Sequence, residues 1–119
     1  MNGNKVYLEP LMIINTVASY FKLPPENVIC TQRKREFIKA KHIAMYCFKQ
    51  FTDMSLYKIG TFFHDKNHAT ILHAIKSVNN QKDVYMIYRN ELNEILDELQ
   101  IEANGIEFEK YKNYQTENA

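Results

Sequence analysis

The stretch SLYKIGTFFHDKNHATILHAIKSVN, residues 55–79, is the most informative part of this chain. Apolar residues recur at helical spacing before and after a polar break at residues 64–66, so we expect two helices joined by a tight turn. Ser55 and Asn67 stand just before these helices, where a side-chain oxygen can cap free backbone N–H groups. This arrangement is typical of a helix-turn-helix, which presents the first turn of its second helix to the DNA major groove. An ordinary helical hairpin in a small bundle is the competing interpretation.

Helical patterns extend to both sides of this segment. The spacing of apolar residues predicts four further helical segments, at residues 9–22, 25–29, 35–51 and 84–99. Polar residues 79–83 predict a break before the last helix. Gly105 and its acidic neighbours predict a frayed or disordered tail from residue 100 onward. No strand is expected, so the sequence predicts one all-α domain of five or six helices at residues 1–100 and an acidic, flexible tail at 101–119.

Length and composition restrict the class of protein. With 119 residues the chain has the size of one domain, which can bury a core without disulfides. Cys30 and Cys47 lie in apolar segments without Cys-x-x-Cys spacing, which indicates free thiols in a reducing cytoplasm. No apolar run approaches the roughly 20 residues that span a bilayer, and the N-terminus lacks the layout of a signal peptide. We therefore expect a cytoplasmic protein without membrane contact.

The net charge of +1 hides a strong asymmetry along the chain. Residues 1–90 carry 13 Lys and Arg against 6 Asp and Glu, whereas residues 91–119 carry 2 against 8. Attraction to phosphate depends on the local field, so a basic body of this kind favours nucleic-acid binding despite the neutral total. A basic surface that is partly neutralised by its own acidic tail is the plainer alternative.

Taken together, residues 33–79 resemble the C-terminal DNA-binding domain of the bacterial replication initiator DnaA. The motif residues of that family keep their order and spacing here, as Ile59-Gly60, Phe62-Phe63, Asn67-His68-Ala69-Thr70, Ile71-Leu72, His73-Ala74 and Lys76. Residues 13–29 look like the preceding helix and connector of the family, so the resemblance covers about residues 10–80. It implies a helix-turn-helix domain of the DnaA domain IV or Trp-repressor type that binds double-stranded DNA.

The resemblance implies two sets of DNA contacts. The positions matched to base contacts are Arg33 in the minor groove and Asn67, His68, Ala69, Thr70 and Leu72 in the major groove. The positions matched to backbone contacts are Lys41, His42, Lys49, Ser55, Tyr57, Lys66 and Lys76. Arginine suits a narrow A·T-rich minor groove because negative potential is concentrated there. Ordinary solvated surface positions are the alternative for the basic residues.

Three of these positions depart from the family pattern. Asn67 replaces an Asp that would accept from a cytosine amino group, and Asn suits adenine better. Ala69 replaces a Thr, so it keeps a methyl group for thymine but loses a hydrogen-bonding group. Tyr57 stands where the family usually has Pro. We therefore expect the docking mode to persist with a preferred sequence that differs from the standard DnaA box; loss of sequence preference is the alternative.

Catalytic and cofactor chemistry is not expected. The sequence has no Gly-x-x-x-x-Gly-Lys-Ser/Thr loop, so the resemblance implies a stand-alone DNA-binding domain without the family's ATPase module. His64, His68 and His73 cross a predicted turn and lack the spacing of metal ligands. No cofactor, metal or nucleophilic set is predicted, and we do not expect an enzyme.

Two functions therefore compete. The first is a double-stranded DNA binder that reads a short asymmetric site. The second is a helical protein-interaction adaptor that has lost specific DNA contact, with acidic residues 91–118 mimicking DNA or binding a basic partner. Several tyrosines would suit such an interface; they are Tyr85, Tyr88, Tyr111 and Tyr114.

Overall fold

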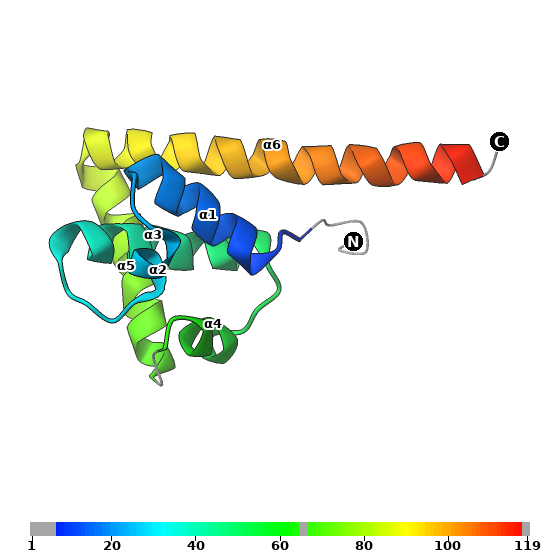
Figure 1. Ribbon diagram of the computed structural model, residues 1–119. Coiled ribbons are helices and arrows are strands. Elements are labelled where there is room, and N and C mark those ends of the chain that lie inside the picture. The colour runs from blue at the N-terminus through cyan, green and yellow to red at the C-terminus, as the bar shows by residue number, and fades with distance from the viewer. Residues whose placement is uncertain (1–6, 65–66, 118–119) are drawn as a thin grey trace.

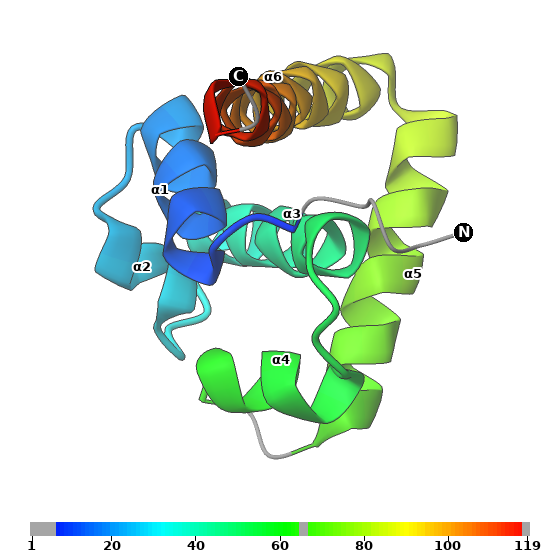
Figure 2. The same ribbon diagram turned by 90° about the vertical axis from the view of Figure 1, so that its right-hand side faces the viewer.

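All regular elements that the structure describes are helices (Figures 1 and 2). The computed structural model describes residues 7–64 and 67–117, with side chains described as far as Ile106. In chain order the helices are α1 (Pro10–Phe21), α2 (Pro25–Ile29), α3 (Arg35–Phe51), α4 (Leu56–Phe62), α5 (His68–Val84) and α6 (Met86–Glu117). The predicted all-α fold with a helix-turn-helix, formed by α4 and α5, is confirmed.

Both caps expected from the sequence are present at the helix-turn-helix. The Oγ of Ser55 accepts a hydrogen bond from the backbone N–H of Lys58 at 3.2 Å, which caps α4. The Oδ1 of Asn67 accepts from the backbone N–H of Ala69 at 2.9 Å, which caps α5. Such caps satisfy N–H groups that have no partner inside the helix, and each contributes about 1 kcal/mol. The start of each helix is therefore fixed by its own sequence.

The core is organised around α3, which packs against α1, α2, α5 and α6. Figure 2 shows α3 near the middle of the molecule with the other helices around it. Ile43, Cys47 and Phe48 of α3 are fully buried. The ring of Phe48 meets the rings of Phe62 and Phe63 with centroids 5.1 and 5.2 Å apart, which anchors the end of α4 to α3.

The second half of the chain differs from the sequence prediction in two places. The predicted break at residues 79–83 is wrong, because α5 continues to Val84 and only Tyr85, in extended conformation, separates it from α6. The helix α6 also continues through Glu117, where the sequence predicted a frayed tail from residue 100. Leu99 is fully buried and Ala103 is buried, so tertiary packing outweighs the helix penalty of about 1 kcal/mol at Gly105. The division at residue 100 into a domain and a tail stays a prediction.

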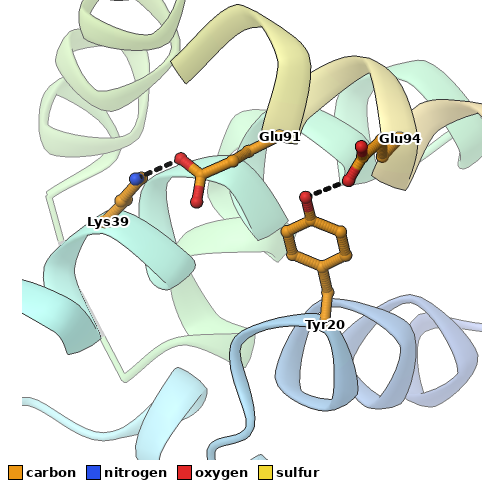
Figure 3. A network of polar contacts seen from close by, with 4 residues as sticks. All are labelled: Tyr20, Lys39, Glu91 and Glu94. Atoms are coloured by element: carbon orange, nitrogen blue, oxygen red, sulfur yellow. Dashed lines mark hydrogen bonds and ion pairs between the residues drawn. The ribbon is translucent and has the colours of Figure 1, made fainter. Parts of the chain in front are cut away.

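The long helix α6 lies on the side of the molecule opposite α4 and projects beyond the other helices (Figure 1). Polar contacts fasten it to the body: Lys39 of α3 pairs with Glu91, and the hydroxyl of Tyr20 on α1 donates to Glu94 (Figure 3). Farther along, Thr16 Oγ1 donates to Glu102 Oε1 at 3.3 Å. Within the described residues, no helix is both long enough and apolar enough to cross a membrane.

Candidate nucleic-acid interface

The first turn of α5 stands in solvent. His68, Ala69 and Thr70 are exposed, whereas Ile71 and Ala74, on the inner side of the same helix, are buried. The apolar side therefore holds α5 against α3 and α4, and the polar side of its first turn faces outward. This exposure is what a base-reading turn requires.

Leu72 and Asn67, which are also expected to contact bases, differ in how much of each side chain is available for a base contact. Leu72 is 42% exposed, so an apolar surface continues along the outer side of α5. Asn67 is exposed, but its Oδ1 already accepts the capping hydrogen bond from Ala69. The structure thus gives Asn67 a role in the helix start that any base contact must share.

A concavity with a volume of about 520 Å³ lies between the first turn of α5 and the segment before α3. Arg33 and Thr70 both line it, and so do Lys41 and His42 of α3. Four residues that the sequence predicted as DNA contacts thus line one concavity, although 37 positions separate Arg33 from Thr70. Tertiary packing brings them together.

Lys41 ties the segment before α3 to the helix itself. Its ammonium group donates to the backbone carbonyl of Cys30, three residues before Arg33. The Lys41 side chain is half-buried, whereas Arg33 is exposed. This contact fixes the path of the chain that leads to Arg33, so Lys41 supports the position of the arginine in addition to its own positive charge.

His42 is half-buried on the next position of α3. Burial lowers the pKa of its imidazole from the ordinary value, and the neighbouring charge of Lys41 lowers it further. Both effects favour the neutral ring, which can still donate one hydrogen bond from the nitrogen that carries the proton.

Those of the other expected backbone contacts that the structure describes do not line this concavity. Lys49 and Ser55 are exposed at the end of α3 and just before α4, Tyr57 is 68% exposed in the first turn of α4, and Lys76 is exposed farther along α5. Lys66 lies outside the described residues. A ligand that contacts all of these positions would have to extend well beyond the concavity, as a duplex does.

The sequence predicted no contact role for three further polar residues that line the concavity, namely Thr31, Gln32 and His64. Gln32 adjoins Arg33, and His64 follows α4 in the turn before α5. The sequence places His64 only in the break between the two helices and among histidines that lack metal-ligand spacing. Its position beside α3 depends on how the turn folds back, which local patterns do not reveal. Among the described residues, no group of His, Cys, Asp and Glu could hold a metal ion.

Comparison with known proteins adds evidence independent of this geometry. The family described as "Bacterial dnaA protein helix-turn-helix" matches residues 10–78, more than half of the chain. This chain belongs to the bacterial DnaA helix-turn-helix family. The match includes both helices of the motif up to Val78 and the whole segment that lines the concavity, and it confirms the family expected from the sequence.

Relatives from distant bacteria bear the name chromosomal replication initiator protein DnaA. The proteins of Bacteroides fragilis and Bacteroides thetaiotaomicron are 43% and 42% identical to the chain over 83 residues, which are 70% of it. The protein of Deinococcus deserti is 34% identical over 107 residues, 88% of the chain. The matched residues are 17%, 18% and 22% of these relatives, so the chain spans about a fifth of their length. At the level of the family, the similarity supports DNA binding and suggests a non-catalytic domain.

Proposed function

We propose that the chain binds double-stranded DNA, with the first turn of α5 in the major groove and Arg33 in the adjacent minor groove. The observation that carries this proposal is the shared concavity, which has Arg33 and Thr70 on its lining. One protein surface thereby offers a helix start to the major groove and an arginine to the neighbouring minor groove. Other DNA-binding proteins also use separate chain segments to contact these two grooves. In this proposal the chain acts where bacterial DNA is, in the cytoplasm.

The exposed side chains of α5 would supply the base contacts. His68 and Thr70 have hydrogen-bonding groups, whereas Ala69 and Leu72 have apolar surface for thymine methyl groups. Asn67 would pair best with adenine. Because Asn67 and Ala69 differ from the residues usual in the family, the preferred site would differ from the standard DnaA box, and each changed contact is worth roughly 1–3 kcal/mol of discrimination.

Backbone contacts would surround these base contacts. Lys41 and His42 lie in the concavity, and the more distant positions proposed to contact phosphates are Lys49, Ser55, Tyr57, Lys66 and Lys76. Phosphate contacts fix the register of the protein on the duplex but carry no sequence information. Within these 119 residues no ATPase loop occurs, so binding would proceed without nucleotide hydrolysis.

A mobility-shift titration tests the proposal with duplexes that contain either a DnaA box or a scrambled sequence, each at about 50 and 200 mM salt. We expect binding that weakens steeply with salt, because counterions are released from phosphates. Arg33→Ala and His68→Ala should weaken it, whereas Arg89→Ala, which removes an exposed arginine of α6, should not. Absence of binding to every duplex at low salt would overturn the proposal.

The second candidate function is that of a protein-interaction adaptor, and an exposed apolar surface supports it. Four consecutive apolar residues at the junction of α5 and α6 are 60–75% exposed, namely Val84, Tyr85, Met86 and Ile87. Exposed apolar patches commonly mark sites of protein interaction. The acidic side of α6 supports this candidate less well, because Glu91, Glu94 and Glu102 already contact the body of the protein. Tyr88, expected at such an interface, is buried, which corrects that expectation.

A further inference from the structure

His64 has a backbone conformation that favours glycine. Its φ is 60°, and among the described residues only Lys22 is another non-glycine with positive φ. His64 directly follows the cap residue of α4, Phe63, and its N–H donates to the carbonyl of Thr61 at 3.1 Å. Helices commonly end with a left-handed residue at this position, and glycine adopts it without steric cost. The histidine side chain is therefore not explained by the way the helix ends.

The exposed side of this turn belongs to the concavity that also contains Arg33, Lys41 and His42. Two of these side chains are cationic, and both histidines can donate from a ring nitrogen. Among the described residues that line the concavity, none is acidic. These donors, on a surface whose described lining has no carboxylate, match the chemistry of a phosphodiester, which presents only acceptor oxygens and negative charge.

The geometry of a duplex indicates which part of DNA would occupy the concavity. Adjacent major and minor grooves are separated by one sugar–phosphate strand. If Thr70 faces the major groove and Arg33 the minor groove, as the proposed function requires, the strand between those grooves must pass across the surface between the two residues. That surface is the concavity, and His64 lines it.

We propose that His64 contacts this strand, donating a hydrogen bond from its imidazole to a phosphate oxygen. The inference rests on the proposed function and adds a backbone contact to it. Residues in sparsely populated backbone conformations cluster at functional sites, and here the left-handed backbone places a donor in the concavity that Lys41 and His42 line from α3. His64 thereby helps to set the register of α5 in the major groove.

The variant His64→Gly separates this role from a purely structural one. Glycine relieves the backbone strain, so the melting temperature of the full chain should rise by a few degrees. The same change removes one phosphate contact, so the affinity for duplex DNA should fall about three- to tenfold. His73→Ala removes an exposed histidine from the outer surface of α5 and should leave affinity unchanged, which controls for general loss of histidine.

Duplexes with single methylphosphonate groups identify the phosphate. A methylphosphonate at the phosphate that His64 contacts should weaken wild-type binding. On that duplex, His64→Gly should cause no further loss of affinity. On duplexes modified at other positions, His64→Gly should still weaken binding. The inference would be overturned if His64→Gly bound duplex DNA with wild-type affinity. It would also be overturned if His64→Gly weakened binding equally at every methylphosphonate position. In both cases Arg33→Ala must still weaken binding, which shows that the proposed function holds. Failure of the wild-type chain to bind any duplex would instead overturn the proposed function on which the inference rests.

Discussion

At the scale of single residues, Asn67 shows how one side chain can serve both the fold and the proposed site. Its Oδ1 caps α5 through the N–H of Ala69, and the same carboxamide is exposed at the proposed DNA surface. An amide oxygen has two lone pairs and the nitrogen carries two donors, so a capping bond leaves hydrogen-bonding capacity in the group as a whole. A substitution at Asn67 must therefore be judged on stability and on base preference separately.

Replacing Asn67 by Asp keeps the capping oxygen but removes the amide donor. We expect nearly unchanged stability and a shift in preference at one base pair, from adenine toward cytosine, worth about 1–3 kcal/mol. Competition binding with duplexes that differ at a single base pair measures the shift. Asn67→Ala is the matched control and should lower the free energy of unfolding by about 1 kcal/mol through loss of the cap. An unchanged base preference in Asn67→Asp would restrict Asn67 to capping.

His42 predicts how stability depends on pH. Its pKa in the folded chain is lowered, first by burial and then by Lys41, so the unfolded chain takes up this proton at a higher pH than the folded chain does. The contribution to the free energy of unfolding is complete above the ordinary histidine pKa of about 6.5, and it declines as the pH falls through that value toward the lowered folded pKa.

The variant His42→Gln should therefore lose less stability than the wild type between about pH 7.5 and pH 5.5. Urea denaturation at several pH values gives the slope of the free energy of unfolding against pH for the wild type and for His42→Gln. Equal slopes in the wild type and His42→Gln would show that this imidazole does not titrate differently in the two states.

At the scale of secondary-structure elements, two tyrosine hydroxyl groups where α6 meets the body have opposite effects on stability. The hydroxyl of Tyr20 donates to Glu94, and this hydrogen bond is the main reason that the pKa of Tyr20 rises to about 12. The hydroxyl of Tyr88 is buried without a hydrogen-bond partner among the described residues, and burial is the main reason that its pKa also rises to about 12. A buried polar group without a partner costs stability.

Removing each hydroxyl should therefore change stability in opposite directions. Tyr88→Phe should leave the free energy of unfolding unchanged or raise it by up to about 1 kcal/mol, because the lost group has no partner. Tyr20→Phe should lower it by about 0.5 kcal/mol, because a solvent-accessible hydrogen bond is lost. Urea unfolding of both variants under one set of conditions tests the pair. A clear loss of stability in Tyr88→Phe would indicate that its hydroxyl does have a partner in solution.

The elements also show where sequence reasoning succeeds. Ser55 and Asn67 cap α4 and α5 as expected, because capping depends on a side chain and on backbone only two or three residues away. The course of α5 through residues 79–83 and of α6 beyond Leu99 was not predicted. These stretches are rich in polar residues, and they are helical because buried residues such as Val78 and Ala103 pack against other helices.

The same distinction applies to the site. The family resemblance named Arg33, Lys41, His42 and Thr70, but neither their common concavity nor the place of His64 in it follows from a local pattern. The concavity arises where the segment before α3, α3 itself and the helix-turn-helix meet. The left-handed conformation of His64 is likewise a property of the folded turn. Residue identities could be predicted, whereas their arrangement required the tertiary structure.

At the scale of the whole molecule, the acidic helix α6 lies away from the helix-turn-helix, although Lys39 of α3 pairs with Glu91 of α6. The concavity is lined by Arg33, Lys41 and other described residues from the segment before α3, from α3 and from the helix-turn-helix, whereas the acidic helix α6 lies on the side opposite α4 (Figures 1 and 2). The Debye length is about 8 Å at physiological ionic strength, so charges on one side of the molecule are largely screened from the other. Charge on α6 should therefore have little influence on the proposed DNA surface.

Neutralising exposed carboxylates of α6 tests this separation. Asp97→Asn combined with Glu98→Gln should change the affinity for duplex DNA by less than about twofold at 0.15 M salt, because screening is effective at that distance. A larger effect at about 0.02 M salt would be consistent with weaker screening. The matched comparison is Lys76→Gln on α5, which should weaken binding at both salt concentrations. A large gain in affinity at 0.15 M salt in the α6 variant would instead mean that the acidic helix restrains DNA binding directly.

The single residue between α5 and α6 has a mechanical consequence. Tyr85 alone is non-helical there, so the two helices form an elbow with almost no slack. A tilt imposed on α5 at its far end cannot be absorbed by a flexible loop and must be taken up by bending the elbow or by sliding α6 over α1 and α3. Because Tyr85 is the only residue between them, a change in the tilt of α5 is transmitted to α6 as a change in its position.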